Sequence, residues 1–137
     1  MDIQLTVITP VKQVLKESVD ELIVQTDSGE ITVLPSHIPL LTKVASGELT
    51  IKKGGKMSHF ALTGGFMEVK ENLVTILADY AVRAEDIEVV KAKEAQERAE
   101  NTMKQKVSQR DFAIAEADLR RSIVELQVAR RHRKSTS

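Results

Sequence analysis

Three histidines are the side chains best suited to acid–base or metal chemistry in this sequence, because cysteine is absent. They are His37, His59 and His132, and no two of them stand at a spacing typical of metal ligands. Ser36 precedes His37, but neighbours on an extended segment point apart, so they form no nucleophile–base pair. His37 reads either as an interface contact or as a loop histidine bonded to backbone. The alternation of His59 with apolar residues favours a position on a strand face.

A glycine pair, Gly64-Gly65, could be mistaken for a phosphate-binding loop. The sequence contains no GxxxxGK(S/T) pattern, and no strand-to-helix transition follows the pair. A tight turn or a bulge is the favoured interpretation. With no nucleophile–base pair and no metal-ligand spacing, we expect a protein that is not an enzyme and that needs no cofactor.

A basic cluster, Arg130-Arg131-His132-Arg133-Lys134, ends the second predicted helix, with Arg120 and Arg121 upstream. It could be a solvated helix end, a patch for an acidic protein surface, or a nucleic-acid site. The net charge of +0 and the single tyrosine, Tyr80, without tryptophan speak against a nucleic-acid platform. An adaptor whose basic helix binds RNA or DNA remains the alternative to a protein-binding module.

The first half of the chain has the period of β-strands. Apolar residues alternate with polar ones, and turn signals separate the runs. The alternating runs are Ile3-Leu5-Val7, Leu22-Val24, Leu49-Ile51 and Val74-Ile76-Ala78, and the turn signals are Asp27-Ser28-Gly29, Lys53-Gly54-Gly55-Lys56 and Lys70-Glu71-Asn72. Many short strands at this spacing predict an antiparallel sandwich or a flattened barrel.

The second half predicts two helices, because glycine and proline are absent from Asp86 onward. Asp86 is expected to cap the first helix, with Glu88 against its positive dipole end. Ser108 and the following residues resemble a capping box that opens the second helix. The expected facing stripes are Ala92, Ala95, Ala99 and Met103 on the first helix, and Phe112, Ala115, Leu119, Ile123 and Leu126 on the second.

The predicted helices should pair antiparallel, because the connection between them is short. Burial of each large apolar side chain contributes roughly 1.5–3 kcal/mol, whereas ordering each residue costs roughly 1–2 kcal/mol. Two helices with so few large apolar residues are marginal alone. We therefore expect a helical hairpin that needs a further surface, either the sandwich or a partner, and that can leave it.

Two segments of this sequence carry a specific resemblance. Residues 28–41, SGEITVLPSHIPLL, resemble the GELGILPGHAPL segment of epsilon subunits of bacterial F-type ATP synthases. Residues 63–69, TGGFMEV, and 72–78, NLVTILA, resemble the second characteristic segment of that family. Thr32 and Ser36 replace glycines of the first segment, which should change local loop geometry only.

The resemblance implies a non-catalytic rotor subunit. Residues 1–84 would form a β-sandwich of about ten strands that binds the gamma subunit and the c-ring. Residues 85–137 would form a two-helix regulatory hairpin that, when extended, inhibits ATP hydrolysis in the catalytic head. With no apolar run of membrane-spanning length, the expected location is peripheral, on the cytoplasmic side of a bacterial cell membrane, touching the membrane only through the complex.

The resemblance also assigns site residues. Glu30 and His37 fall where the family carries a glutamate and a histidine that face the c-ring and stalk. The expected contacts to an acidic loop of the beta subunit are Arg120, Arg121, Arg130, Arg131 and Arg133. The ATP-binding motif of some members is degenerate here, at Ile87, Glu88, Lys91 and Ala92, with Val82 at a usually acidic position. Because lysine lacks the fixed fork of arginine, we expect ATP to bind weakly or not at all.

Overall fold

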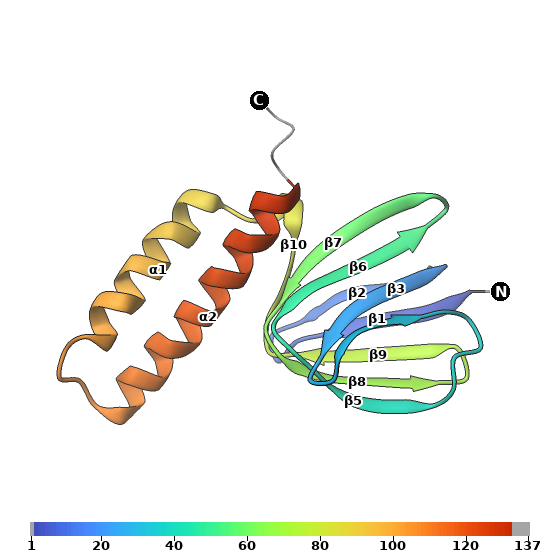
Figure 1. Cartoon of the computed structure of the whole chain (residues 1–137), viewed down its shortest axis with the longest axis horizontal. Helices are drawn as coiled ribbons and strands as arrows, with labels where there is room; N and C mark the ends of the chain where they lie inside the picture. Colours follow the sequence, from blue (N-terminus) through green and yellow to red (C-terminus); the bar gives the residue numbers. More distant parts are fainter. Residues whose placement is uncertain (1, 133–137) are drawn as a thin grey trace.

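The structure is a computed structural model that describes residues 2–132. It has a β half and a helical half (Figure 1). The strands are β1 (Ile3–Ile8), β2 (Gln13–Val19), β3 (Glu21–Thr26), β4 (Gly29–Val33), β5 (Leu40–Val44), β6 (Gly47–Lys53), β7 (Lys56–Leu62), β8 (Gly65–Lys70), β9 (Leu73–Ala78) and β10 (Ala81–Arg83). The short helix η1 (Ala84–Asp86) leads into α1 (Val89–Met103) and α2 (Gln109–His132). The predicted sandwich of about ten strands followed by two helices is confirmed.

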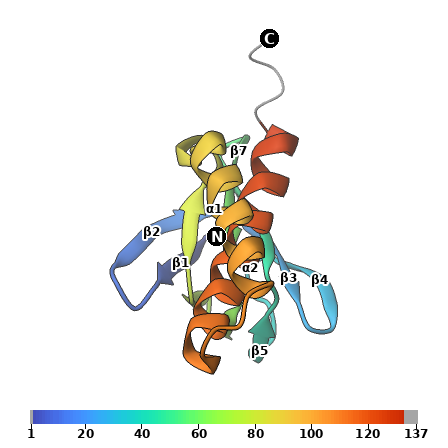
Figure 2. The ribbon, with the colours of Figure 1, turned by 90° about the vertical axis from the view of Figure 1, so that its left-hand side faces the viewer.

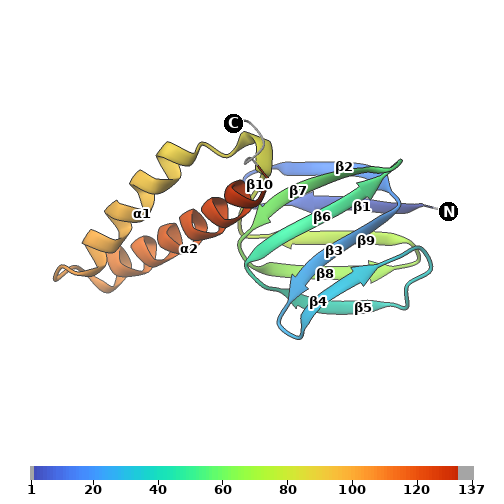
Figure 3. The ribbon, with the colours of Figure 1, turned by 45° about the horizontal axis from the view of Figure 1, so that its top comes forward.

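The strands follow one hydrogen-bonded path, β10-β7-β6-β3-β5-β8-β9-β1-β2, with β4 paired to β3. The path folds back on itself, so that β7, β6 and β3 cross in front of β2, β1 and β9 (Figure 3). All pairs are antiparallel except β1 with β9, in which Leu5 faces Val74 and Val7 faces Ile76. The first strand thus lies between its neighbour β2 and the ninth strand.

The core fills the space between the two layers. The alternation seen in the sequence places the apolar set inward, as expected for half-buried strands. The fully buried side chains of this core include Ile3, Leu5, Val7, Leu22, Val24, Leu49, Ile51, Phe60, Met67 and Ile76. The predicted strand faces are therefore confirmed.

The predicted turns are confirmed as well. Gly54 and Gly55, with φ of 57° and 81°, close the hairpin in which Lys53 pairs with Lys56. Gly64 and Gly65 form a tight turn that leads into β8, not a phosphate-binding loop. At Gly65 φ is 125°, and a Cβ atom there would overlap the carbonyl oxygen of Leu77 on β9.

The helices α1 and α2 form an antiparallel hairpin that projects from one end of the sandwich (Figure 1). α2 lies between α1 and the strands, and α1 covers its outer side (Figure 2). The predicted cap of α2 is confirmed, because Ser108 Oγ accepts a hydrogen bond of 3.0 Å from the backbone N–H of Asp111.

The predicted start of the first helix is wrong. Asp86 lies in η1, and α1 begins only at Val89, with Glu88 as the residue before it. The Glu88 side chain does not cap the helix; its carboxylate pairs with Lys91 at 3.0 Å. Ile87 is buried and extended, which separates η1 from α1. Burial of this side chain against α2 decides where the helix begins, a tertiary effect that outweighs a local capping preference.

The predicted apolar stripe of α2 is wrong in part. Phe112 and Ile123 are 39% and 37% exposed, whereas the buried residues are Ala115, Ser122, Val124, Val128 and Ala129. The alanine stripe of α1 is buried at Ala92 and Ala99. α2 has two neighbours, and small side chains let it approach α1 closely while its valines face the sandwich. The buried face is therefore set by both neighbours, not by the largest side chains.

Candidate functional site

The contact between α2 and the sandwich is small and apolar at its centre. Val124, Val128 and Ala129 of α2 pack with Ala61, Ala84 and Ile87, a cluster separate from the main core. Full burial of a valine or isoleucine contributes at most about 1.5–3 kcal/mol, and alanine less. We call this the docked arrangement, and its apolar part alone is marginal.

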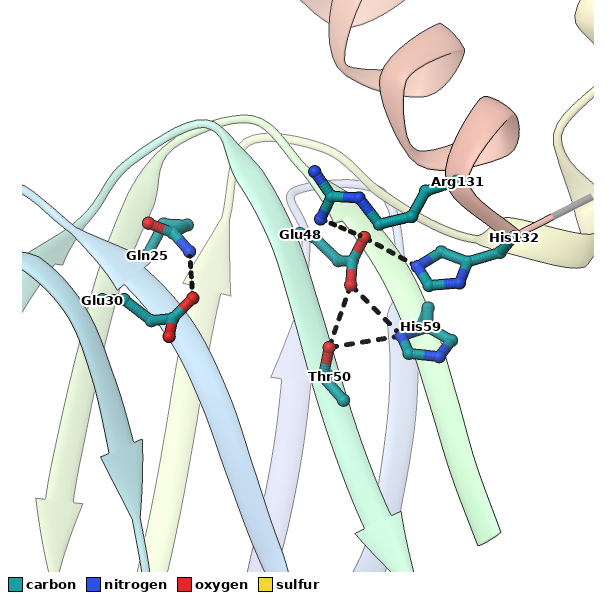
Figure 4. Close-up of polar contacts among 7 residues, drawn as sticks. All are labelled: Gln25, Glu30, Glu48, Thr50, His59, Arg131 and His132. Carbon is teal, nitrogen blue, oxygen red and sulfur yellow. Dashed lines mark hydrogen bonds and ion pairs between the residues drawn. The ribbon is translucent and has the colours of Figure 1, made fainter.

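A polar cluster closes the docked arrangement at the C-terminal end of α2 (Figure 4). Glu48 of β6 holds its Oε1 atom 2.8 Å from Nε2 of His132 and 3.1 Å from the Arg131 guanidinium. Its Oε2 atom accepts a hydrogen bond of 3.0 Å from the Thr50 hydroxyl and lies 3.2 Å from Nδ1 of His59. The rings of His59 and His132 stack with centroids 3.6 Å apart. We call these five residues the Glu48 clasp.

The protonation of the clasp follows from its surroundings. Burial alone would raise the pKa of Glu48, but hydrogen bonds from His132 and Thr50 and nearby positive charge outweigh burial, and the pKa is lowered. Burial lowers the pKa of His59, and the charge of His132 lowers it further, despite the attraction of Glu48. At neutral pH the clasp therefore contains a carboxylate beside a neutral His59 ring.

A second polar contact joins the middle of α2 to the end of the sheet. Tyr80, between β9 and β10, donates a hydrogen bond of 2.8 Å from its hydroxyl to Glu125. The Arg121 guanidinium lies 4.0 Å from the centre of the Tyr80 ring. Burial, followed by the hydrogen bond and charge of Glu125, raises the pKa of Tyr80 to about 12. The hydroxyl therefore stays protonated and donates throughout the neutral range.

A cavity lies between α1, α2 and β10 beside this contact, and its charged lining is more acidic than basic. The acidic residues are Asp86, Glu88, Asp118 and Glu125, and the basic residues are Lys91, Arg98 and Arg121. Of the degenerate ATP motif, Glu88, Lys91 and Ala92 line this cavity, whereas Ile87 packs in the apolar contact with α2.

Glu30 lies near the start of β4 and His37 lies in the loop beyond its other end, so the two residues are not brought together. Glu30 is exposed at the start of the strand, where its carboxylate accepts a hydrogen bond of 2.9 Å from Gln25 (Figure 4). His37 lies in the loop after the strand, with Nδ1 2.7 Å from the carbonyl oxygen of Ile38. The preceding Ser36 has a φ of 67°, a left-handed conformation that glycine adopts more easily. The interface roles of Glu30 and His37 stay predictions.

The predicted arginine contacts fall into two groups. Arg121 and Arg131 take part in the docked arrangement, through Tyr80 and Glu48. Arg120 and Arg130 are exposed on α2. Arg133 lies outside the described residues. Sequence reasoning missed Glu48 and the role of His132, because no local pattern connects a glutamate on a strand with the end of a helix.

The chain combines a β-sandwich with a docked two-helix hairpin, and each part matches a family model. Residues 2–84 match the family model described as the beta-sandwich domain of the ATP synthase delta/epsilon chain. Residues 85–130 match the model of its long alpha-helix domain. Within residues 2–132, neither helix has the length and apolarity that crossing a bilayer requires.

Proteins named ATP synthase epsilon chain are similar over nearly the whole sequence. The one from Herpetosiphon aurantiacus is 45% identical over 133 residues, covering 97% of this chain and 98% of its own length. The one from Geobacter sulfurreducens is 41% identical, covering 93% of each chain. A chain of the Euglena gracilis mitochondrial ATP synthase, solved as OSCP/F1/c-ring, superposes with a TM-score of 0.74 and 28% identity, over 96% of this chain and 82% of that one.

The chain therefore belongs to the epsilon-chain family of ATP synthase. Members of this family are structural and regulatory subunits of the central stalk, not catalytic ones. The family match covers both halves of the described chain, and it gives no support to the nucleic-acid-binding adaptor.

Proposed function

We propose that this chain joins the catalytic head to the c-ring and restrains ATP hydrolysis through its hairpin. Residues 1–84 bind the gamma subunit and the c-ring, and residues 85–137 act as the regulatory part. The chain is a peripheral component on the cytoplasmic side of a bacterial cell membrane. The docked arrangement supports the regulatory half of the proposal, because a helix held by so small a contact can exchange this surface for another.

The outer face of the sandwich supports a binding role for the β half. Leu41 of β5, Phe66 of β8, and Leu73 and Leu77 of β9 are 71%, 49%, 54% and 51% exposed. Phe66 and Leu77 are direct partners across the β8–β9 pair. Leu41 faces Glu68 and Leu73 faces Lys70, so this face combines exposed apolar side chains with charged ones. Such a face is typical of a protein interface, and gamma is the partner we assign to it.

The loop after β4 supports a second contact, with the c-ring. Leu34 and Ile38 are 50% and 75% exposed on either side of His37. The loop lies at the end of the sandwich remote from the hairpin (Figure 1). A subunit that joins two partners needs two such separate surfaces.

The hairpin has surfaces for both of its proposed states. When docked, Arg121 and Arg131 contact Tyr80 and Glu48 of the sandwich. When extended along gamma, the same arginines are released and, with Arg120 and Arg130, can face an acidic loop of the beta subunit. The exposed Phe112, Ile114 and Ile123 gain a partner in that state. The docked and extended states therefore compete, because Arg121 and Arg131 can contact the sandwich or the beta subunit but not both.

Hydrolysis of ATP by the cognate catalytic head tests the proposal directly. We compare the head reconstituted with the full chain and with a version that ends at Glu85. Removal of the hairpin should raise hydrolysis several-fold, while cosedimentation shows that both versions bind. Equal activity with both versions bound would refute the inhibitory role and leave only coupling. Failure of both to bind would refute the assigned partners.

ATP binding to the isolated chain is expected to be weak or absent. The cavity lined by Lys91 has four carboxylates and three cationic side chains. Its net charge is therefore negative and repels a polyphosphate. Lys91 already pairs with Glu88, and Arg121 already stacks on Tyr80, so a phosphate group would have to displace these contacts to bind either cation. Calorimetric titration with Mg-ATP measures the affinity. A dissociation constant in the low micromolar range, lost in a Lys91→Ala variant, would contradict this expectation.

A further inference from the structure

We propose that Glu48, His59 and His132 form a binding site for a divalent transition-metal cation of the zinc class, which joins α2 to β6 and β7. The three side chains offer one carboxylate oxygen and two imidazole nitrogens, all within 4.8 Å of one another. The proposal rests on this geometry, and it goes beyond the inhibitory role proposed above.

The donor atoms already stand near the spacing of a coordination sphere. Nε2 of His132 lies 2.8 Å from Oε1 of Glu48, and Nδ1 of His59 lies 3.2 Å from Oε2. Ligands at 2.0–2.2 Å around a tetrahedral zinc ion are about 3.3 Å apart. The two rings are stacked within 10° of parallel, and both turn a nitrogen toward the same carboxylate (Figure 4). Because the lone pair of an imidazole nitrogen lies in the ring plane, one ring has to rotate out of the stack before both nitrogens can bind one ion.

The donor set selects the class of cation. Two imidazoles and one carboxylate suit zinc and its first-row neighbours, whereas calcium and magnesium prefer oxygen ligands alone. The exposed fractions of the side chains are 13% for Glu48, 19% for His59 and 21% for His132, so the site is sheltered but open to a water ligand. The Thr50 hydroxyl, bonded to Glu48 at 3.0 Å, would orient the carboxylate from outside the coordination sphere.

Arg131 is the group that opposes the cation. Its guanidinium lies 3.1 Å from Oε1 of Glu48, but its side chain is 65% exposed and can turn into solvent. Its positive charge should reduce the affinity without blocking the site. Removing that charge in an Arg131→Gln variant should therefore strengthen metal binding.

The ligands come from both halves of the molecule. Glu48 and His59 lie on the paired strands β6 and β7, and His132 ends α2. A bound cation would hold the end of α2 on the sheet, and undocking would remove one of the three ligands. By linkage, a saturating cation favours the docked arrangement by the ratio of its affinities for the two states, so a tenfold loss of affinity on undocking would favour docking about tenfold.

Titration of the full-length chain, without an affinity tag and after treatment with a chelator, tests the site. Calorimetry with Zn²⁺ gives the affinity and stoichiometry, and the visible spectrum of added Co²⁺ reports its coordination. Hydrogen exchange in the last turn of α2 reports docking. The variants are His59→Ala, His132→Ala and Glu48→Gln, and the matched control is His37→Ala, which removes a histidine remote from the site.

We expect one cation per chain, a Co²⁺ spectrum of low coordination number, and slower exchange in α2 with Zn²⁺. Each ligand substitution should weaken binding tenfold or more, and His37→Ala should leave it unchanged. Because His132 ends a helix, its substitution leaves the sandwich intact and keeps the test valid if His59→Ala unfolds. Absence of binding at millimolar cation, or binding that survives both histidine substitutions, would overturn the proposal.

Discussion

Replacement of Gly65 by alanine is expected to destabilise the sandwich by about 4 kcal/mol or more, beyond the usual range for a single methyl group. With φ of 125°, Gly65 is in a conformation that side-chain-bearing residues rarely adopt. A Cβ atom there would overlap the carbonyl oxygen of Leu77 and lie 2.9 Å from Cα of Ala78. These atoms belong to the backbone of β9, so relief requires β8 and β9 to separate at that point.

Gly55→Ala is the matched control for this prediction. Gly55 also has a positive φ, 81°, but a Cβ atom there would meet open space. Its substitution should cost only about 1–2 kcal/mol, the usual penalty of a left-handed conformation. Denaturant unfolding of both variants measures the difference in free energy. Equal losses would show that conformation alone, without the overlap at Leu77, explains the effect.

Replacement of Val128 by aspartate is expected to detach α2 while the sandwich stays folded. Val128 is 3% exposed and packs with Val124 against Ala61 and Ile87. Burying an unpaired carboxylate in that apolar cluster costs several kcal/mol. The docked contact is too small to offset this penalty, so the helix should leave the sheet.

Hydrogen exchange and limited proteolysis across α2 measure this detachment. Gln127→Asp is the matched control, because it introduces the same charge one position away on the exposed side of the helix. Only Val128→Asp should accelerate exchange in α2, and β-strand protection should be unchanged in both variants. If the proposed role is correct, Val128→Asp should also deepen inhibition of ATP hydrolysis. Retention of α2 protection in Val128→Asp would contradict the view that the contact is marginal.

The strands could be predicted from the sequence because their burial is local and periodic. Leu5 and Val7, or Leu22 and Val24, alternate with exposed neighbours wherever one face of a strand meets the core. The turn at Gly54-Gly55 and the cap at Ser108 depend only on adjacent residues. Such features need no knowledge of the rest of the chain.

The docked arrangement could not be predicted, because it depends on distant residues. His59 and His132 read separately as a strand residue and part of a basic tail, yet their rings stack. The buried face of α2 follows from contacts on two sides, so Phe112, the most conspicuous apolar residue of the helix, stays 39% exposed. The first helix begins at Val89 and not directly after Asp86, because Ile87 packs against α2 in an extended conformation.

The parallel pairing of β1 with β9 sets the order in which the chain can fold during synthesis. Leu5 leaves the ribosome early, but its partner Val74 emerges only when the sandwich sequence is almost complete. The local hairpins, such as β6 with β7, can form at once, whereas closure of the sheet must wait for this long-range contact. Until then one edge of β1 is unpaired and can form hydrogen bonds with strands of other chains. This risk of misassembly follows from the topology of the sheet.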